Sequence, residues 1–98
     1  MMTRTEHLLT IAAEECSEIA QRISKAIRFG LKEVQPGQER TNAERIMVEF
    51  ADLCVVMEHL VNDGDLDEDT VDYEKFYQEK SERLEKFIEH ARKCGTVL

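Results

Sequence analysis

Residues 41–64 read TNAERIMVEFADLCVVMEHLVNDG and contain a helix together with its start and stop signals. Thr41 and Glu44 match the Ser/Thr-x-x-Glu capping box, in which each side chain accepts a hydrogen bond from the other residue's backbone amide. The Asn-Asp-Gly step at residues 62–64 is a turn signal. Apolar residues between these signals recur at steps of three and four, which predicts an amphipathic helix. They are Ile46, Phe50, Leu53, Cys54, Met57, Leu60 and Val61.

A helix is also predicted before this segment, from about Thr5 to Phe29. Gly30 follows it at the position where a helix-ending glycine is common. The Pro36-Gly37 step then marks a loop between the two helices. The apolar stripe of the first helix consists of Leu8, Ala12, Cys16, Ile19, Ile23, Ala26 and Ile27.

A third helix is predicted after an acidic linker that runs from Asp63 to Asp69. We expect Asp67 or Asp69 to act as a helix N-cap. No segment shows the alternation of a strand, so the sequence predicts an all-α fold in one domain, residues 1–98. The apolar residues of the third helix are Tyr73, Phe76, Tyr77, Leu84, Phe87, Ile88 and Ala91.

The short length of the chain favours oligomerisation. A chain of 98 residues buries only about 60–65% of the surface that it exposes when unfolded. We therefore expect a dimer or tetramer that buries apolar side chains between subunits. The candidates for this interface are Leu53, Met57, Leu60, Phe76, Leu84 and Phe87.

The composition excludes several classes of partner. The net charge is -8, with 21 acidic and 13 basic residues, which argues against nucleic-acid and anionic membrane surfaces. No run approaches the roughly 18 apolar residues of a membrane span. The N-terminus lacks a signal-peptide pattern, and three cysteines without pair spacing suit free thiols. We therefore expect a cytoplasmic protein.

Two acid-x-x-acid pairs are the candidate functional residues: Glu15 with Glu18, and Glu49 with Asp52. Residues three apart lie side by side on a helix, and both pairs border the predicted apolar stripes. Four clustered carboxylates repel one another unless a cation lies between them. A hard divalent cation such as Mg²⁺ prefers such oxygen ligands and often completes its shell with substrate phosphates.

Simpler interpretations of these residues remain open. The acidic pairs also fit a solvated face, since the chain is rich in acids. Arg22 and Lys25 follow the first pair and are candidate phosphate contacts, or else ion-pair partners of nearby acids. His59 is a candidate nucleotide contact, or else a solvated or packed histidine.

Glu14-Glu15-Cys16-Ser17-Glu18, followed after a loop by Glu49-Phe50-Ala51-Asp52, resembles the signature of the MazG-like all-α nucleoside triphosphate pyrophosphohydrolases. That signature is E-E-x-x-E with E-x-x-D on the next long helix. The resemblance covers about Leu8 to Leu60. An asparagine often stands in the family where this chain has His59, so the family's substrate contact at that position does not carry over to this chain directly.

The resemblance implies a fold and an activity. Members are helical dimers or tetramers with four-helix cores shared between subunits. They hydrolyse NTPs or dNTPs to the monophosphate and pyrophosphate with Mg²⁺ or Mn²⁺, and paired metal ions suit that chemistry. Glu15, Glu18, Glu49 and Asp52 would be the metal ligands and catalytic residues. The compact size resembles phage-encoded or stand-alone members, which implies the host cytoplasm for a phage protein and dGTP as a first substrate to test.

Two other classes of function compete with hydrolysis. Asp63, Asp65, Asp67 and Glu74 fall at positions 1, 3, 5 and 12 of a possible EF-hand calcium loop. However, position 6 is Glu68, where the sharp turn requires glycine. The other alternative is a purely structural helical module, which the aromatic stripe of the third helix also suits.

Overall fold

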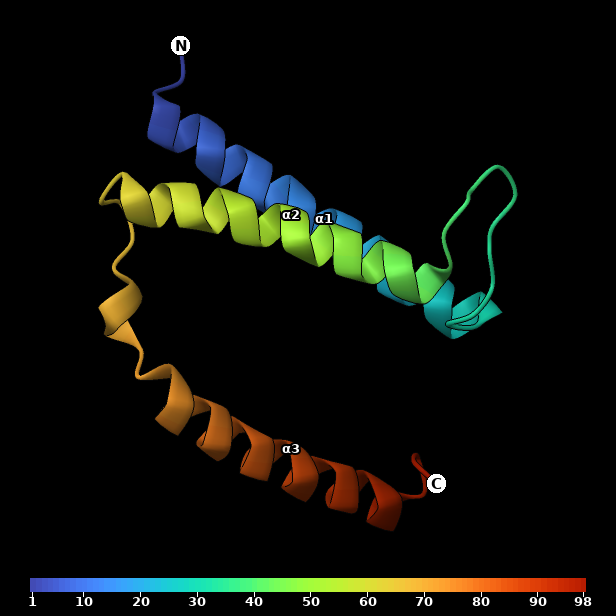
Figure 1. The fold of residues 1–98 in the computed structure, drawn as a ribbon. Coiled ribbons are helices and arrows are strands. Elements are labelled where there is room, and N and C mark those ends of the chain that lie inside the picture. Colours follow the sequence, from blue (N-terminus) through green and yellow to red (C-terminus); the bar gives the residue numbers. More distant parts are fainter. The chain divides into compact units, whose positions relative to one another are not determined.

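The computed structural model describes residues Met1 to Leu98 and is entirely helical, without strands (Figure 1). This confirms the predicted all-α class. The elements are α1 (Arg4–Phe29), α2 (Asn42–Asn62), a 3₁₀ helix η1 (Glu68–Thr70) and α3 (Tyr73–Cys94).

The chain divides into two compact units, Met1–Leu66 and Asp67–Leu98. The first contains α1 and α2, and the second contains η1 and α3. The single domain, the MazG-like bundle and the four-helix core completed by a partner chain stay predictions.

The predicted ends of α1 and α2 are confirmed to within about one residue. The Thr3 side chain caps α1 by accepting a hydrogen bond from the Glu6 amide at 3.1 Å. Gly30 ends α1 with φ 103°, a conformation that a residue with a Cβ rarely adopts. At α2 both halves of the capping box form, with distances of 3.1 and 3.0 Å between Thr41 and Glu44.

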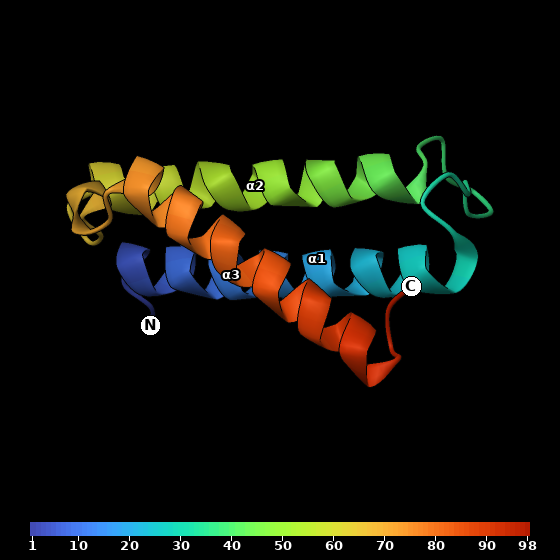
Figure 2. The same ribbon diagram turned by 90° about the horizontal axis from the view of Figure 1, so that it is seen from below.

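α1 and α2 form an antiparallel hairpin in which the two helices lie side by side (Figures 1 and 2). The residues that each helix turns toward the other recur at alternating steps of three and four, as in other packed helix pairs. We call these residues the helix–helix interface. In α1 they are Thr5, Leu8, Ala12, Glu15, Ile19, Arg22 and Ala26, and in α2 they are Asn42, Ile46, Glu49, Leu53, Val56 and Leu60.

The predicted apolar stripes are only partly the helix–helix interface. Cys16, Ile23 and Ile27 of α1 are exposed, as are Phe50 and Met57 of α2. The physical reason is that each apolar stripe is broader than the narrow strip that one neighbouring helix covers. The hairpin therefore leaves a second apolar side on each helix.

The core of the hairpin is small. Its buried apolar residues are Ala12, Ala26 and Leu60, and Leu60 is completely buried. Leu60 was expected between subunits, and that expectation is wrong because the hairpin itself encloses its side chain. Most of the hairpin's apolar surface lies outside this core.

The loop between α1 and α2 is anchored by Asn42. Its side-chain Nδ2 donates to the Gly30 carbonyl at 2.8 Å and to Glu33 Oε1 at 3.1 Å. Within the loop, the Gln38 amide donates to the Gln35 carbonyl at 3.0 Å, and Gly37 has φ 80°. Pro36-Gly37 therefore occupies the centre of a turn that requires glycine in its second central position.

In the second unit, Asp72 caps α3 by accepting a hydrogen bond from the Lys75 amide at 3.3 Å. Asp67 is the N-cap of η1, where it accepts from the Asp69 amide at 2.9 Å. The expected N-cap at Asp67 thus starts the short helix, and a different aspartate starts α3. Gly95 ends α3 in the left-handed conformation.

Candidate metal centre

Three carboxylates converge in the middle of the hairpin. One oxygen from each of Glu15, Glu49 and Asp52 lies within 4.8 Å of the other two. We call these three residues the acidic cluster. No other group of three acidic, histidine or cysteine residues in the structure meets in this way.

The helix periodicity explains why these side chains meet. Glu15 occupies an interface position of α1 between Ala12 and Ile19, and Glu49 occupies an interface position of α2. Asp52 follows Glu49 by three residues and is therefore its neighbour on the surface of α2. Glu15 and Glu49 are half-buried, whereas Asp52 is exposed, so the cluster opens to solvent on one side.

The surroundings of Glu15 disfavour its ionised form. Desolvation raises the pKa of Glu15 above its usual value, and the Asp52 charge and a hydrogen bond with Glu49 raise it further. Glu15 Oε2 is buried and has no hydrogen-bond partner. A buried oxygen without a partner is uncommon in folded proteins. This oxygen is therefore free to act as a ligand for a cation.

The residues fit a hard divalent cation. Carboxylate oxygens are the ligands that Mg²⁺ and Mn²⁺ accept, and Mg²⁺ usually keeps only one or two protein carboxylates and fills its remaining positions with water or phosphate. Glu15, Glu49 and Asp52 would supply those oxygens. A cation would also offset the negative charges that, after desolvation, raise the pKa of Glu15.

Glu18, the fourth predicted ligand, lies one turn along α1 and is not part of the acidic cluster. It accepts a hydrogen bond from Arg22 Nη2 at 3.4 Å. The Arg22 Nε also lies 3.9 Å from Glu49 Oε1, and only 16% of the Arg22 side chain is exposed. Arg22 therefore lies between two of the predicted metal ligands.

The other predicted substrate contacts lie further from the acidic cluster. Lys25 donates to the Gln35 side chain at 3.2 Å and so braces the loop. His59 is exposed on α2, seven residues beyond Asp52. No protein partner is found for the His59 ring, and its role as a substrate contact stays a prediction.

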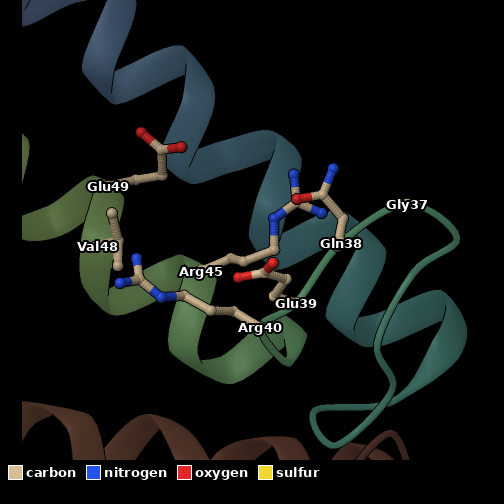
Figure 3. Close-up of a pocket in the computed structure, with 7 residues that line it drawn as sticks. All are labelled: Gly37, Gln38, Glu39, Arg40, Arg45, Val48 and Glu49. Carbon is tan, nitrogen blue, oxygen red and sulfur yellow. The ribbon is translucent and has the colours of Figure 1, made fainter.

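A cavity next to the acidic cluster was not foreseen from the sequence. It has a volume of about 480 Å³ and lies where the loop enters α2 (Figure 3). Glu49 belongs both to its wall and to the acidic cluster. A sequence signal existed, because Arg45 precedes Glu49 by one helical turn and Arg40 precedes the N-cap. The lining residues are Gly37, Gln38, Glu39, Arg40, Arg45, Val48 and Glu49.

Three of the four carboxylates of the possible calcium loop have protein partners instead. Asp63 pairs with Arg4 Nε at 2.8 Å, and Asp65 accepts a hydrogen bond from Thr5 Oγ1 at 2.9 Å. Both contacts hold the end of α2 against the start of α1. Asp67 caps η1, as described above. These contacts give the three aspartates a structural role.

No family model, curated protein or solved structure matches this chain. None of the helices is both long enough and apolar enough to cross a membrane.

Proposed function

We propose that the protein is a metal-dependent hydrolase that cleaves nucleoside or deoxynucleoside triphosphates between the α- and β-phosphates. The products would be the monophosphate and pyrophosphate. The observation that carries the proposal is the convergence of Glu15, Glu49 and Asp52 within 4.8 Å. The likeness of residues 14–18 and 49–52 to the MazG-like signature is the basis for naming the bond between the α- and β-phosphates as the one cleaved.

The chain's own residues would have separate roles in binding the cation and the substrate. A bound divalent cation supplies neutralisation of phosphate charge and activation of the attacking water. Glu15, Glu49 and Asp52 hold that cation, and the exposed side of the cluster at Asp52 admits the substrate. Arg22 restrains the Glu49 and Glu18 carboxylates through ion pairs.

Cation binding would compete with protonation of Glu15. Desolvation and the neighbouring carboxylates raise the pKa of Glu15, so its protonated form persists to a higher pH than that of an ordinary glutamate. Glu15 must be ionised to act as a cation ligand. Metal affinity should therefore increase with pH through the range in which Glu15 ionises.

Assembly into a homodimer or homotetramer is part of the proposal. The second apolar side of the hairpin, including Phe50 and Met57, is exposed on a single chain. Large exposed apolar surfaces mark interaction sites. A purely structural module would use the same surface, but it would not need the acidic cluster.

A substrate panel tests the activity. All common NTPs and dNTPs, beginning with dGTP, would be incubated with Mg²⁺ or Mn²⁺, and the products would be separated by ion-exchange chromatography. We expect monophosphate and pyrophosphate, and no turnover in EDTA. Diphosphate and phosphate as the main products would contradict the proposed bond.

Neutral variants test the site. Glu15→Gln, Glu49→Gln and Asp52→Asn should each lower kcat/KM at least about 100-fold, because an amide is a poor ligand for Mg²⁺. Glu58→Gln is the matched control, since Glu58 is exposed on α2 and lies outside the cluster. Glu18→Gln then decides whether the fourth carboxylate takes part. Near-normal turnover in two of the three cluster variants would disprove the site.

A further inference from the structure

The cavity beside the acidic cluster combines a suitable size with two arginines. Its volume of about 480 Å³ lies within the roughly 300–1,000 Å³ of small-molecule sites. Arg40 comes from the end of the loop and Arg45 from the first turn of α2 (Figure 3). Gln38 contributes an amide from the same loop.

Arg40 and Arg45 have no carboxylate partner within 4.0 Å, although the chain is strongly acidic. Of the other five arginines, Arg4, Arg22 and Arg92 form such pairs, whereas Arg28 and Arg83 lie over the rings of Phe29 and Phe76. Neither Arg40 nor Arg45 donates a side-chain hydrogen bond to the protein. Their guanidinium groups therefore retain donors for a ligand, and guanidinium geometry matches phosphate oxygens.

The acids around the cavity do not neutralise these arginines by contact. Glu39 and Glu49 line the wall. Arg40 also contributes to lowering the pKa of Glu44, after two larger effects of hydrogen bonds with Thr41. Glu44 is already held in the capping box, so its carboxylate is engaged with backbone and side chain at the start of α2.

The cavity and the acidic cluster are continuous through Glu49. Its carboxylate is one corner of the cluster, and its side chain is part of the cavity wall (Figure 3). An anion in the cavity would thus lie next to a cation in the cluster. A chain of linked phosphates is the simplest ligand that would occupy both places.

We propose that Arg40 and Arg45 form a binding subsite for the terminal pyrophosphate unit of a nucleoside triphosphate. This rests on the proposed function. The terminal phosphates carry more charge than the α-phosphate, so two unpaired guanidinium groups suit them best. The α-phosphate then lies nearer the acidic cluster. The subsite would bind free inorganic pyrophosphate as well, because recognition depends on the phosphate oxygens alone.

The first experiment detects the subsite without turnover. Inorganic pyrophosphate would be titrated into the full-length protein in EDTA while the arginine Nε–Hε resonances are followed by NMR. We expect the Arg40 and Arg45 resonances to shift and that of Arg28 to stay unchanged, because Arg28 is exposed on α1 outside the cavity. Sulfate at equal ionic strength should cause smaller shifts. Unmoved Arg40 and Arg45 resonances would overturn the proposal.

The second experiment measures the contribution to catalysis. Arg40→Gln and Arg45→Gln should each raise KM about tenfold and change kcat less than about threefold, as expected for the loss of a charge-assisted hydrogen bond to the substrate. Arg28→Gln changes the net charge equally and should behave as wild type. Arg45→Lys keeps the charge but removes the bidentate contact, and it should give an intermediate KM.

The two proposals fail differently. If pyrophosphate shifts both arginines but no nucleotide is hydrolysed, the proposed function is wrong and the phosphate subsite stands. If hydrolysis requires the acidic cluster but both glutamine variants keep the wild-type KM, the subsite is wrong and the proposed function stands.

Discussion

Replacing Asn42 with alanine should destabilise the hairpin. The Asn42 side chain is 1% exposed and donates one hydrogen bond to a carbonyl and one to the Glu33 carboxylate. A neutral hydrogen bond contributes about 1 kcal/mol and one to a charged group about 1.5–3 kcal/mol. Gly30 and Glu33 are open enough to regain water, and the unpartnered Oδ1 of Asn42 is removed. We therefore expect a net loss of about 2 kcal/mol.

Thermal unfolding followed by circular dichroism would measure this loss. A loss of about 2 kcal/mol corresponds to a decrease in Tm of about 8–16 °C for a domain of this size. Asn62→Ala is the control, because Asn62 is exposed at the end of α2 and should change stability by less than about 0.5 kcal/mol. Asn42→Asp should be worse than alanine at pH 7, since it would place a second carboxylate 3.1 Å from Glu33 Oε1. An Asn42→Ala protein with the same Tm as wild type would refute the anchoring role of Asn42.

Three further predictions concern charge and packing. In EDTA, Glu15→Gln should melt above wild type at pH 7.5 and converge with it near pH 4, because the raised pKa of Glu15 makes ionisation above its usual value of 4.5 a cost to the folded state. Glu44→Gln should melt below wild type at pH 7, and the gap should close under acid, because the lowered pKa of Glu44 stabilises the fold only while the carboxylate is ionised. Leu60→Asp should unfold the hairpin, as measured by circular dichroism, because the Leu60 side chain is 0% exposed. Phe50 is 50% exposed, so Phe50→Asp should leave the hairpin helical and reduce the sedimentation coefficient of any oligomer.

The sequence predicted those features that depend on neighbouring residues. The capping box needs only Thr41 and Glu44 at their spacing, and Gly30 ends its helix through its own backbone freedom. The meeting of Glu15 with Glu49 also followed from periodicity, once the two helices were assumed to pack. The capping signals act over one or two turns and do not require knowledge of the tertiary fold, whereas the meeting of Glu15 with Glu49 also requires that α1 packs against α2.

The features that the sequence did not predict depend on tertiary packing. A wide apolar stripe does not indicate which half its neighbour covers, so Leu60 was assigned to a subunit interface although the hairpin buries it. Likewise, the cavity forms where residues 37–40 of the loop lie beside Arg45 and Glu49 of α2, and Arg40 lines it because of that arrangement. Residue spacing alone does not reveal the burial of Leu60 within the hairpin or the position of Arg40 in the cavity wall.

The position of Glu15 and Glu49 within the helix–helix interface has a consequence for the hairpin itself. Their carboxylates interrupt a contact whose only buried apolar side chains are those of Ala12, Ala26 and Leu60. A cation between them would join α1 to α2 at this weak point, and its binding free energy would be added to the stability of the folded state. The concentration of free divalent cation would then govern how often the two helices separate. Removing the cation with a chelator would lower the stability of the hairpin.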